Sequence, residues 1–314
     1  MAELVASIDI GTNSTRLLVA ELEAGQPLRS RERLMRITRL GQGVDKTGSL
    51  DADAMERTVN VLKEYRTVMD SLGVGEGRIR MAATSACRDA SNREVFFDAA
   101  QQAVGVRPEL LSGEAEAELS FRGATAGLSV ADQPFLVFDL GGGSTEFVFG
   151  TVGDAGRIES HISIDVGCVR LTERFLSQAD PPEPEDLAAA ITFTDAWLDD
   201  VELAIPQIGE ANTVVGLAGT VSTVAAVEIG LASYDRDQIH GFRLTKVAAE
   251  DVFRTLVTES RADRIHNPGL EEARADVIVG GCCALVAIMR RFGIEEIVCS
   301  ESDILDGLAM SVVG

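Results

Sequence analysis

The stretch VFDLGGGSTEF at residues 137–147 repeats a pattern that first occurs as SIDIGTNSTRL at residues 7–17, and this repetition decides the fold. In both stretches an apolar run ends in an aspartate, enters a tight glycine turn and continues with serine and threonine. Four pairs of positions coincide at a constant offset of 130 residues: Asp9 with Asp139, Gly11 with Gly141, Ser14 with Ser144, and Thr15 with Thr145. The sequence therefore predicts two copies of one structural unit, each presenting the same kind of loop.

The composition is that of an ordinary globular protein. The chain has 314 residues, 46% hydrophobic and 25% charged, which is enough for one large domain or two of usual size. Its longest apolar stretch, residues 277–289, is shorter than the ~20 residues that a membrane span needs, so we expect a buried helix there. The start does not read as a secretion signal, and the five cysteines lack the spacing of a metal site. We expect a cytoplasmic protein with reduced thiols and no membrane partner.

The charge of the chain bears on its partners. A formal net charge of −22 argues against nucleic-acid binding, which needs a basic surface. It is compatible with a polyanionic substrate held in a locally positive cleft, because local fields rather than the net charge decide that. The three histidines, at 161, 240 and 266, are too scattered to indicate a metal cluster.

Strand and helix signals in the first half follow the order βββαβαβα. Strands are expected at 4–10, 14–22, 28–40, 78–85 and 107–112, with turns at 11–13 and 24–27. Helices are expected at 54–72, 92–104 and 114–124, the first capped by Asp51 and the second by Asn92. A meander that continues through helical crossovers implies a mixed sheet with helices on its faces.

The second half begins in the same way. Three strands are expected at 135–140, 145–152 and 157–164, with a turn near 153–156, followed by a helix at 185–205 and a strand at 213–219. After further helices come a helix at 275–293, a strand at 295–302 and a helix from 303. We therefore predict one domain of residues 1–122 with 300–314, and a second of residues 123–299.

The glycine turns have a specific chemistry. A tight turn after a strand aims backbone N–H groups at a small concavity that suits phosphate oxygens, and serine or threonine hydroxyls add donors. An aspartate at the strand end can hold Mg²⁺ beside those phosphates. One such turn alone is weak evidence, but two in register predict a clamp on a phosphate chain. A third turn follows the strand in TVVGLAGT (213–220), and taken alone it reads better as a plain strand-to-helix junction.

Five ordered motifs carry a resemblance to a known family: DIGTNSTRLLV (9–19), ATSACRDASN (83–92), SGEAEAELSFRG (112–123), DLGGGSTEF (139–147) and GCVRLTERF (167–175). RADVIVGG (274–281) extends the likeness toward the C-terminus. The chain resembles the short form of the exopolyphosphatase and guanosine pentaphosphate phosphohydrolase family. That family belongs to the superfamily of actin, sugar kinases, acetate kinase and heat-shock chaperones. The resemblance implies an α/β fold of two ribonuclease H-like domains with an interdomain cleft.

The resemblance also implies roles for individual residues. It implies metal ligands at Asp139 and Glu146, with Asp9 a weaker candidate. It implies phosphate-binding residues at Asn13, Ser14, Arg16, Ser85, Arg88, Gly141, Gly142, Gly143, Ser144, Arg170, Gly219 and Thr220. For Arg88, a salt bridge with Asp89 or Glu94 at the helix entry is the structural alternative. Cys168 reads as a packed small residue rather than a nucleophile.

The resemblance places the catalytic base at Glu116. Relatives usually carry a Glu-Glu pair here, whereas this chain reads Glu114, Ala115, Glu116. Glu114 is the rival, and for either residue a solvated helix face is the alternative. A second departure is the segment SESDILDGLA, with Leu305 and Asp306 where many relatives carry Arg-Glu. Arg29, Arg31 and Arg33 share one face of a predicted strand; they could steer a polyphosphate tail, but charge on an exposed strand edge explains them better.

The predicted activity is removal of terminal orthophosphate from inorganic polyphosphate, with Mg²⁺ or Mn²⁺ and a supporting monovalent ion such as K⁺. Guanosine pentaphosphate is the alternative substrate. Two other classes stay open: an ATP-dependent kinase that binds adenosine at the turn 216–220, and a nucleotide- or alarmone-binding regulator without turnover. The resemblance also implies a homodimer.

Overall fold

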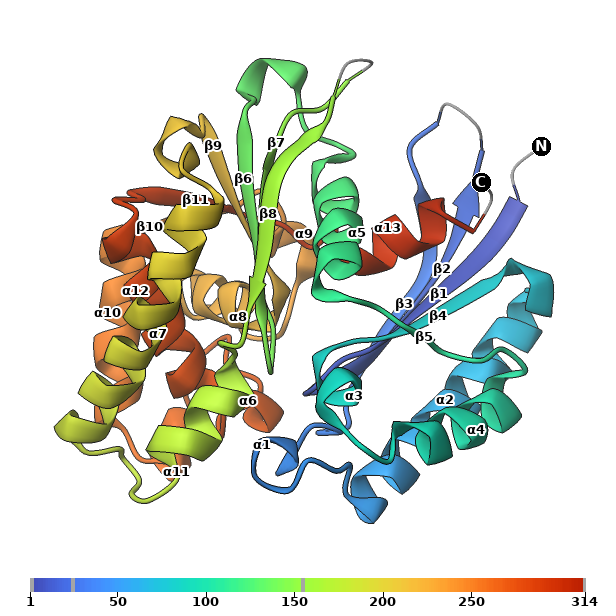
Figure 1. The fold of residues 1–314 in the computed structure, drawn as a ribbon, viewed down its shortest axis with the longest axis horizontal. Coiled ribbons are helices and arrows are strands. Elements are labelled where there is room, and N and C mark those ends of the chain that lie inside the picture. The colour runs from blue at the N-terminus through green and yellow to red at the C-terminus, as the bar shows by residue number, and fades with distance from the viewer. Residues whose placement is uncertain (1–2, 24–25, 154–155, 313–314) are drawn as a thin grey trace. The chain divides into compact units, whose positions relative to one another are not determined.

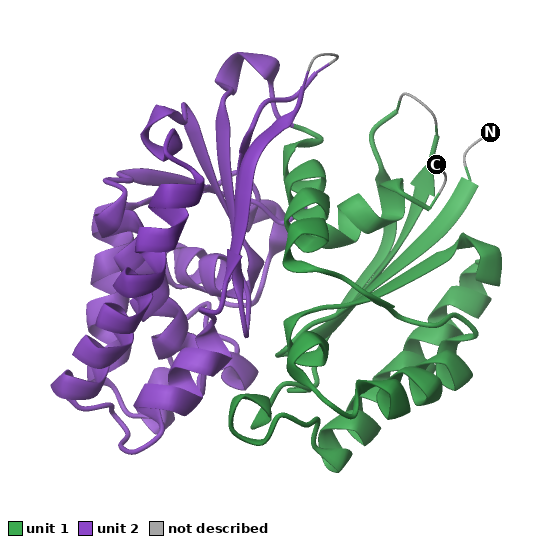
Figure 2. Cartoon of the chain, viewed as in Figure 1, with its two compact units in different colours: residues 1–127, 303–314 green, residues 128–302 purple. Residues whose placement is uncertain are grey.

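The computed structural model describes residues 3–23, 26–153 and 156–312, and the chain divides into two compact units (Figure 1). Unit 1 comprises residues 1–127 and 303–314, and unit 2 comprises residues 128–302 (Figure 2). The predicted domain boundaries were 122/123 and 299/300, whereas the boundaries in the structure are 127/128 and 302/303. The turns predicted at 24–27 and 153–156 fall partly outside the described residues.

Unit 1 follows the predicted order of elements. Its strands are β1 (Glu3–Ile10), β2 (Ser14–Leu22), β3 (Arg29–Ile37), β4 (Ile79–Ala83) and β5 (Glu109–Leu110). Its helices are α1 (Val44–Thr47), α2 (Ala52–Leu72), α3 (Ser85–Asp89), α4 (Arg93–Val104), α5 (Gly113–Thr125) and α13 (Ile304–Met310). The sheet order is β3-β2-β1-β4-β5; β1, β2 and β3 pair antiparallel, and β1, β4 and β5 run parallel. This mixed sheet is the ribonuclease H-like arrangement that the resemblance implied.

Helices cover both faces of the unit 1 sheet, as the alternation along β1 requires. Ala6, Ile8 and Ile10 pack in one cluster with the buried faces of α2 and α4. Val5 packs on the opposite face against α13, where the hydroxyl of Ser7 also donates to the carbonyl of Leu305 at 2.7 Å. Both faces are therefore dry, and β1 is a central strand whose end is rigidly placed.

Unit 2 repeats the arrangement with one addition. Its strands are β6 (Phe135–Leu140), β7 (Thr145–Gly150), β8 (Ile158–Ile164), β9 (Thr213–Leu217), β10 (Arg243–Thr245) and β11 (Glu296–Cys299). Its helices are α6 (Cys168–Leu171), continued by a π-helical turn at Thr172–Leu176, then α7 (Pro184–Ala204), α8 (Ala218–Ile229), α9 (Arg236–Ile239), α10 (Lys246–Thr258), α11 (Arg261–Arg264) and α12 (Ile278–Arg291). The sheet order is β10-β11-β9-β6-β7-β8, so β10 adds an antiparallel edge strand. The sequence did not predict β10, because three residues carry too little pattern.

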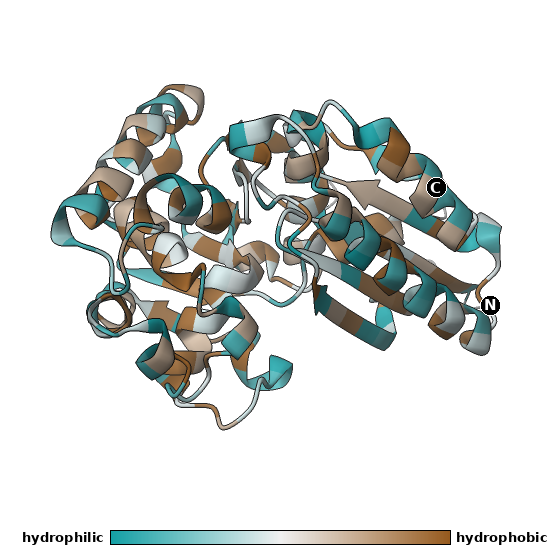
Figure 3. Cartoon of the chain, turned by 90° about the horizontal axis from the view of Figure 1, so that it is seen from below, coloured by the Kyte–Doolittle hydropathy of each residue, from teal (hydrophilic) through white to brown (hydrophobic). Residues whose placement is uncertain are grey.

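The sequence dictates most helix boundaries. Asp51 caps α2 by accepting the N–H of Ala54 at 3.0 Å, as predicted, and Gly73 ends the helix with a positive φ of 81°. Apolar and polar residues alternate around the turns of such helices in Figure 3, which is the pattern of a helix with one buried face. The predicted cap at Asn92 is wrong: its side chain forms two hydrogen bonds with the backbone of Leu50 instead, at 2.8 and 2.9 Å.

Two further observations concern the apolar segments. The stretch at 277–289 lies in α12, whose residues from Ile278 to Met289 are all buried within unit 2. Across residues 3–23, 26–153 and 156–312, no helix combines the length and the apolar character that crossing a membrane requires.

The crossing of α5 and α13 yields a stability prediction. A Cβ added at Gly123 would lie 1.8 Å from the carbonyl oxygen of Asp303, so Gly123→Ala must push the two helices apart. We expect the free energy of unfolding to fall by about 1–3 kcal/mol. Both stabilities are measured by urea denaturation. Gly127→Ala is the control, because a Cβ at Gly127 would meet no atom within 4 Å. Equal unfolding midpoints for the two variants would contradict the close crossing.

Candidate active site

The predicted site residues of each unit gather at one edge of its sheet. In unit 1 the parallel strands β1, β4 and β5 lead at their carboxyl ends into the first glycine turn, α3 and α5. In unit 2 the parallel strands β6, β9 and β11 lead into the second glycine turn, the start of α8 and the segment before α13. Ligands of mixed α/β sheets bind at the carboxyl ends of parallel strands. Each unit thus presents its candidate residues where a ligand is expected.

The two glycine turns are closed by the same hydrogen bond. The N–H of Gly11 donates to the carbonyl of Ser14 at 3.0 Å, and the N–H of Gly141 donates to the carbonyl of Ser144, also at 3.0 Å. The carboxylates that lead the turns are nearly buried, with Asp9 4% and Asp139 8% exposed. The repeat seen in the sequence is therefore a repeat of backbone geometry.

The carbonyl groups of both turns are held from behind, while several N–H groups are not. Thr38 and Arg39 donate to the carbonyl of Asn13 at 3.0 and 2.9 Å, and Gly41 donates to that of Thr12 at 2.8 Å. In unit 2, backbone N–H groups of residues 168–170 donate to the carbonyls of Gly141 and Gly142 at 2.9–3.2 Å. By contrast, the backbone N–H groups of Thr12, Asn13, Gly142 and Gly143 donate to no acceptor in the described parts of the chain.

The second turn is fixed by Gly167 and Arg170. A Cβ at Gly167 would lie 2.4 Å from the carbonyl of Gly142, so only glycine permits this close approach. The guanidinium of Arg170 donates through Nε to the carbonyl of Gly143 at 2.8 Å. Arg170, predicted as a phosphate ligand, therefore also holds the turn from the side of its carbonyls.

Glu116 and Arg88 meet in unit 1. Ser112 caps α5, which places Glu116 in the first turn of that helix. One oxygen of Glu116 accepts a hydrogen bond from Nη1 of Arg88 at 2.6 Å, and the same nitrogen donates to the carbonyl of Leu111 at 3.1 Å. Glu114 is exposed on the helix, whereas Glu116 is partly buried. Of the two rival bases, the structure brings Glu116 together with a predicted phosphate ligand.

Ser85 lies beside the first turn. The N–H of Thr84, the residue before it, donates to the carbonyl of Ile10 at 3.2 Å, which ties α3 to the end of β1. Ser85 is 3% exposed. Its hydroxyl forms no hydrogen bond within the described residues, so it has donor capacity to spare.

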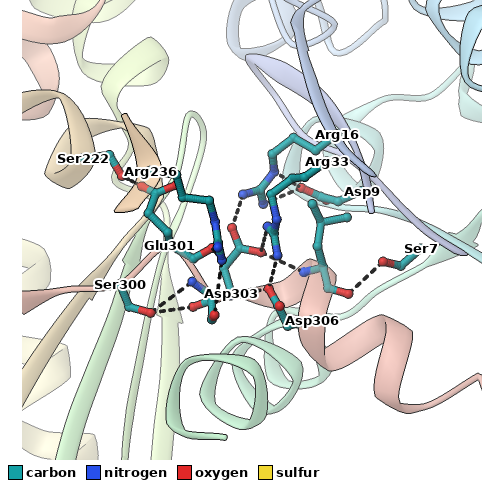
Figure 4. A network of polar contacts seen from close by, with 12 residues as sticks. Ser7, Asp9, Arg16, Arg33, Ser222, Arg236, Ser300, Glu301, Asp303 and Asp306 are labelled. Carbon is teal, nitrogen blue, oxygen red and sulfur yellow. Dashed lines mark hydrogen bonds and ion pairs between the residues drawn. The ribbon is translucent and has the colours of Figure 1, made fainter. Parts of the chain in front are cut away.

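Arg16 lies in a cluster of charges that the sequence did not predict (Figure 4). Its Nε and Nη2 donate to Oδ2 of Asp9 at 3.0 and 2.6 Å, and its Nη1 pairs with Asp303. Arg33 pairs with Asp306 and lies 3.7 Å from Asp303. Burial raises the pKa of Asp9, although Arg16 acts in the opposite direction. Burial also opposes ionisation of Asp303, but Arg16 and Arg33 outweigh it and hold the pKa of Asp303 below its usual value.

Arg29, Arg31 and Arg33 of β3 are engaged with carboxylates. Arg29 and Arg31 pair with Glu21 on the neighbouring strand, and Arg33 pairs with Asp303 and Asp306. These contacts agree with the structural explanation preferred from the sequence over a role in steering polyphosphate.

Asp139 and Glu146 are suited to a hard cation. They face each other across the β6–β7 pair, and Oε1 of Glu146 accepts the hydroxyls of Ser144 and Ser163, each at 2.8 Å. In unit 1, Oδ1 of Asp9 and Oδ1 of Asn13 are buried oxygens without a hydrogen-bond partner. The described residues contain no group of three or more His, Cys, Asp or Glu side chains able to hold a metal ion. Mg²⁺ commonly uses only one or two carboxylates and completes its shell with water and substrate phosphate, so the pair Asp139 and Glu146 of unit 2 fits it.

Arg274, for which no role was predicted, covers the third turn at residues 216–220. A Cβ at Gly219 would lie 1.8 Å from Nη1 of Arg274, so the guanidinium rests against the glycine backbone. Thr220 is buried and hydrogen-bonds the thiol of Cys168. Burial raises the pKa of that thiol and keeps it protonated, in agreement with a packing role for Cys168. Arg274 is the first residue of the motif RADVIVGG, and that motif is the sequence signal from which its role at the turn could have been predicted.

Comparisons with known proteins identify the family of the chain. The Ppx/GppA phosphatase family is matched over residues 18–314, and the chain belongs to that family. Exopolyphosphatase 2 of Mycobacterium tuberculosis is 41% identical over 99% of this chain and 98% of its own length. The PPX-GPPA enzyme of Aquifex aeolicus has a similar structure, with a TM-score of 0.81 and 33% identity over 99% of this chain and 100% of the other. An exopolyphosphatase from Cytophaga hutchinsonii gives a TM-score of 0.86 and 27% identity, covering 97% and 96% of the two chains.

A metal prediction follows from Asp139 and Glu146. Isothermal titration should detect Mg²⁺ binding to the parent protein, and Glu146→Gln should weaken it at least about tenfold, because a carboxylate becomes a neutral amide of the same shape. Glu159→Gln, on the partly exposed stretch of β8, is the matched control with the same loss of charge. If both variants bind Mg²⁺ like the parent, Glu146 is not a metal ligand.

Proposed function

We propose that the protein is an exopolyphosphatase that hydrolyses the terminal phosphoanhydride bond of inorganic polyphosphate and releases orthophosphate. The observation that carries this proposal is the state of the two glycine turns, whose carbonyls are held by the protein while N–H groups at the same turns remain available. Such oriented N–H groups bind phosphate oxygens without needing a basic surface. Family membership and the names of similar proteins support the same activity.

The chemistry assigned to unit 1 needs few groups. The oxygen of a water molecule attacks the terminal phosphorus, the bond to the bridging oxygen breaks, and the water loses a proton. Glu116 is the acceptor for that proton. Arg88 holds Glu116 in place, and a guanidinium group at this position suits the oxygens of the terminal phosphate. A bound Mg²⁺ would neutralise phosphate charge, with Asp139 and Glu146 as its proposed ligands and Asp9 as a further candidate.

The ligands and setting of the enzyme belong to the same proposal. We expect Mg²⁺ or Mn²⁺ as the divalent ion, with K⁺ as a supporting ion, and a homodimer in the cytoplasm. Phosphate contacts are assigned to the turns around Ser14 and Ser144 and to the hydroxyl of Ser85. Gly219 and Thr220 are weaker members of the set, because Arg274 covers the first and Cys168 engages the second.

One observation bears on the alternative that the protein is an ATP-dependent kinase. The guanidinium of Arg274 occupies the space over Gly219, where the kinase alternative requires an adenosine. An adenosine at this turn would have to displace that side chain. Removal of the terminal phosphate from guanosine pentaphosphate remains the second candidate, since its reacting phosphoanhydride is of the same type.

Phosphate release compared across substrates tests the proposal. Under matched Mg²⁺, we expect release from long polyphosphate without ATP and without an acceptor, because water is the only co-reactant of a hydrolase. Tripolyphosphate, guanosine pentaphosphate and ATP are measured alongside. Faster release from guanosine pentaphosphate would favour the second candidate, and release that depends on ATP plus an acceptor would establish a kinase.

Glu116 and Glu114 provide a matched pair of variants. Glu116→Gln keeps the shape of the side chain and its bond to Arg88 but cannot accept the proton of water. Turnover should therefore fall about 10²–10⁴-fold while polyphosphate still binds. Glu114→Gln removes the same charge from the same helix turn and should change turnover much less. A dead Glu114→Gln with an active Glu116→Gln would reverse the assignment.

A further inference from the structure

Arg16 carries a phosphate-binding role from the family resemblance, yet its charge is already shared between two carboxylates. It lies opposite Asp9 in the β1–β2 pair, two residues after Ser14 of the first turn. Asp9 takes up Nε and Nη2, and Asp303 takes up Nη1. Its side chain is 18% exposed, so it is not completely buried. A phosphate at the first turn would therefore compete with protein carboxylates for this cation.

Asp303 is a fixed anion rather than a mobile surface residue. It caps α13: its Oδ1 accepts the N–H of Leu305 at 2.9 Å, and its own N–H donates to Asp306 at 3.0 Å. The backbone around it is clamped, because its carbonyl lies against Gly123 of α5. A Cβ added at Gly307 of α13 would in turn lie 2.1 Å from the carbonyl oxygen of Leu119. The carboxylate cannot move away without disturbing the start of the helix.

The charges of the cluster do not balance. Two guanidinium groups, from Arg16 and Arg33, face three carboxylates: Asp9, Asp303 and Asp306. Oδ1 of Asp9 is left buried and without a partner. With carboxylates already in excess, the approach of a further anion is opposed by Coulomb repulsion.

We propose that Asp303 is an internal counterion that competes with substrate phosphate for Arg16 and so sets the affinity of the first glycine turn. Its side chain is an affinity-determining group that acts through Arg16 and touches no reacting atom. This inference rests on the proposed function, because it requires phosphate at the first turn. It concerns a segment, SESDILDGLA, in which the chain departs from many relatives.

Asp303→Asn and Asp306→Asn form a matched pair for the test. Asparagine caps helices about as well as aspartate, so both variants keep the acceptor that the start of α13 needs. Each removes one negative charge from the same cluster, but only Asp303 contacts Arg16. Asp306 contacts Arg33, which lies farther along the sheet from the first turn than Arg16 does. Thermal unfolding and circular dichroism of both variants establish that they are folded.

Binding of tripolyphosphate is measured by calorimetry in the Glu116→Gln background, where it is not consumed. We expect Asp303→Asn to lower the dissociation constant of tripolyphosphate by about three- to tenfold. A change of this size lies between the contribution of an exposed ion pair to binding and that of a charge-assisted hydrogen bond. Asp306→Asn should shift the dissociation constant less than about twofold, because its charge acts only at a distance. In the active enzyme the same change should appear as a lower KM, with kcat not increased.

The outcomes separate this inference from the proposed function. Weaker binding in Asp303→Asn, or equal shifts in the two variants, overturns the role of Asp303 even if the parent hydrolyses polyphosphate. Absence of phosphate release by the parent overturns the proposed function. If Glu116→Gln binds neither tripolyphosphate nor orthophosphate, both proposals fail.

Discussion

The orientation of a few peptide groups is the constraint on which the rest of the site depends. In each unit, a strand ends in a nearly buried aspartate and the chain turns back through a single hydrogen bond between a glycine N–H and a serine carbonyl. Segments that follow later in the chain hold the neighbouring carbonyls from behind, so the N–H groups of the turn are left to face a ligand. This arrangement costs no reorganisation when a phosphate arrives, which is the property of a preorganised anion site. It also explains why glycine is required at 167, where a side chain would collide with the turn.

The negative net charge of the protein is compatible with an anionic substrate. With a net charge of −22, the chain cannot attract a polyanion by its overall field. The arginines near the candidate residues are individually engaged: Arg88 with Glu116, Arg16 with two aspartates, and Arg170 with the carbonyl of Gly143. Such cations are held in place before a substrate arrives. In the proposed function, a phosphate therefore meets donors whose positions are already fixed, and selectivity comes from how well its oxygens match them.

Most of the fold could be predicted because its signals are local or repeated. The apolar run of β1, the cap at Asp51 and the two glycine turns were each readable from a few residues, and the structure has the strands and the helix that they predict. Errors arose where tertiary contacts decide the outcome. Asn92 has the right residue type for a cap but binds the backbone of Leu50 from another segment, and β10 exists only because β11 lies beside it. The same holds for the candidate site. Its glycine turns could be predicted from the sequence, whereas the pairing of Arg16 with Asp303, which lies 287 residues away, could not.

The C-terminal departure shows how one chain redistributes its charges. Leu305 is 1% exposed and packs with Val5, Leu18 and Ala20, so this position belongs to the core of unit 1. The cation at the start of α13 comes from the sheet, as Arg33 on β3 reaches Asp306 and lies near Asp303. The start of a short helix thus packs against α5 and pairs through Asp303 with Arg16, which connects this segment to the first glycine turn although it contains none of the glycine motifs.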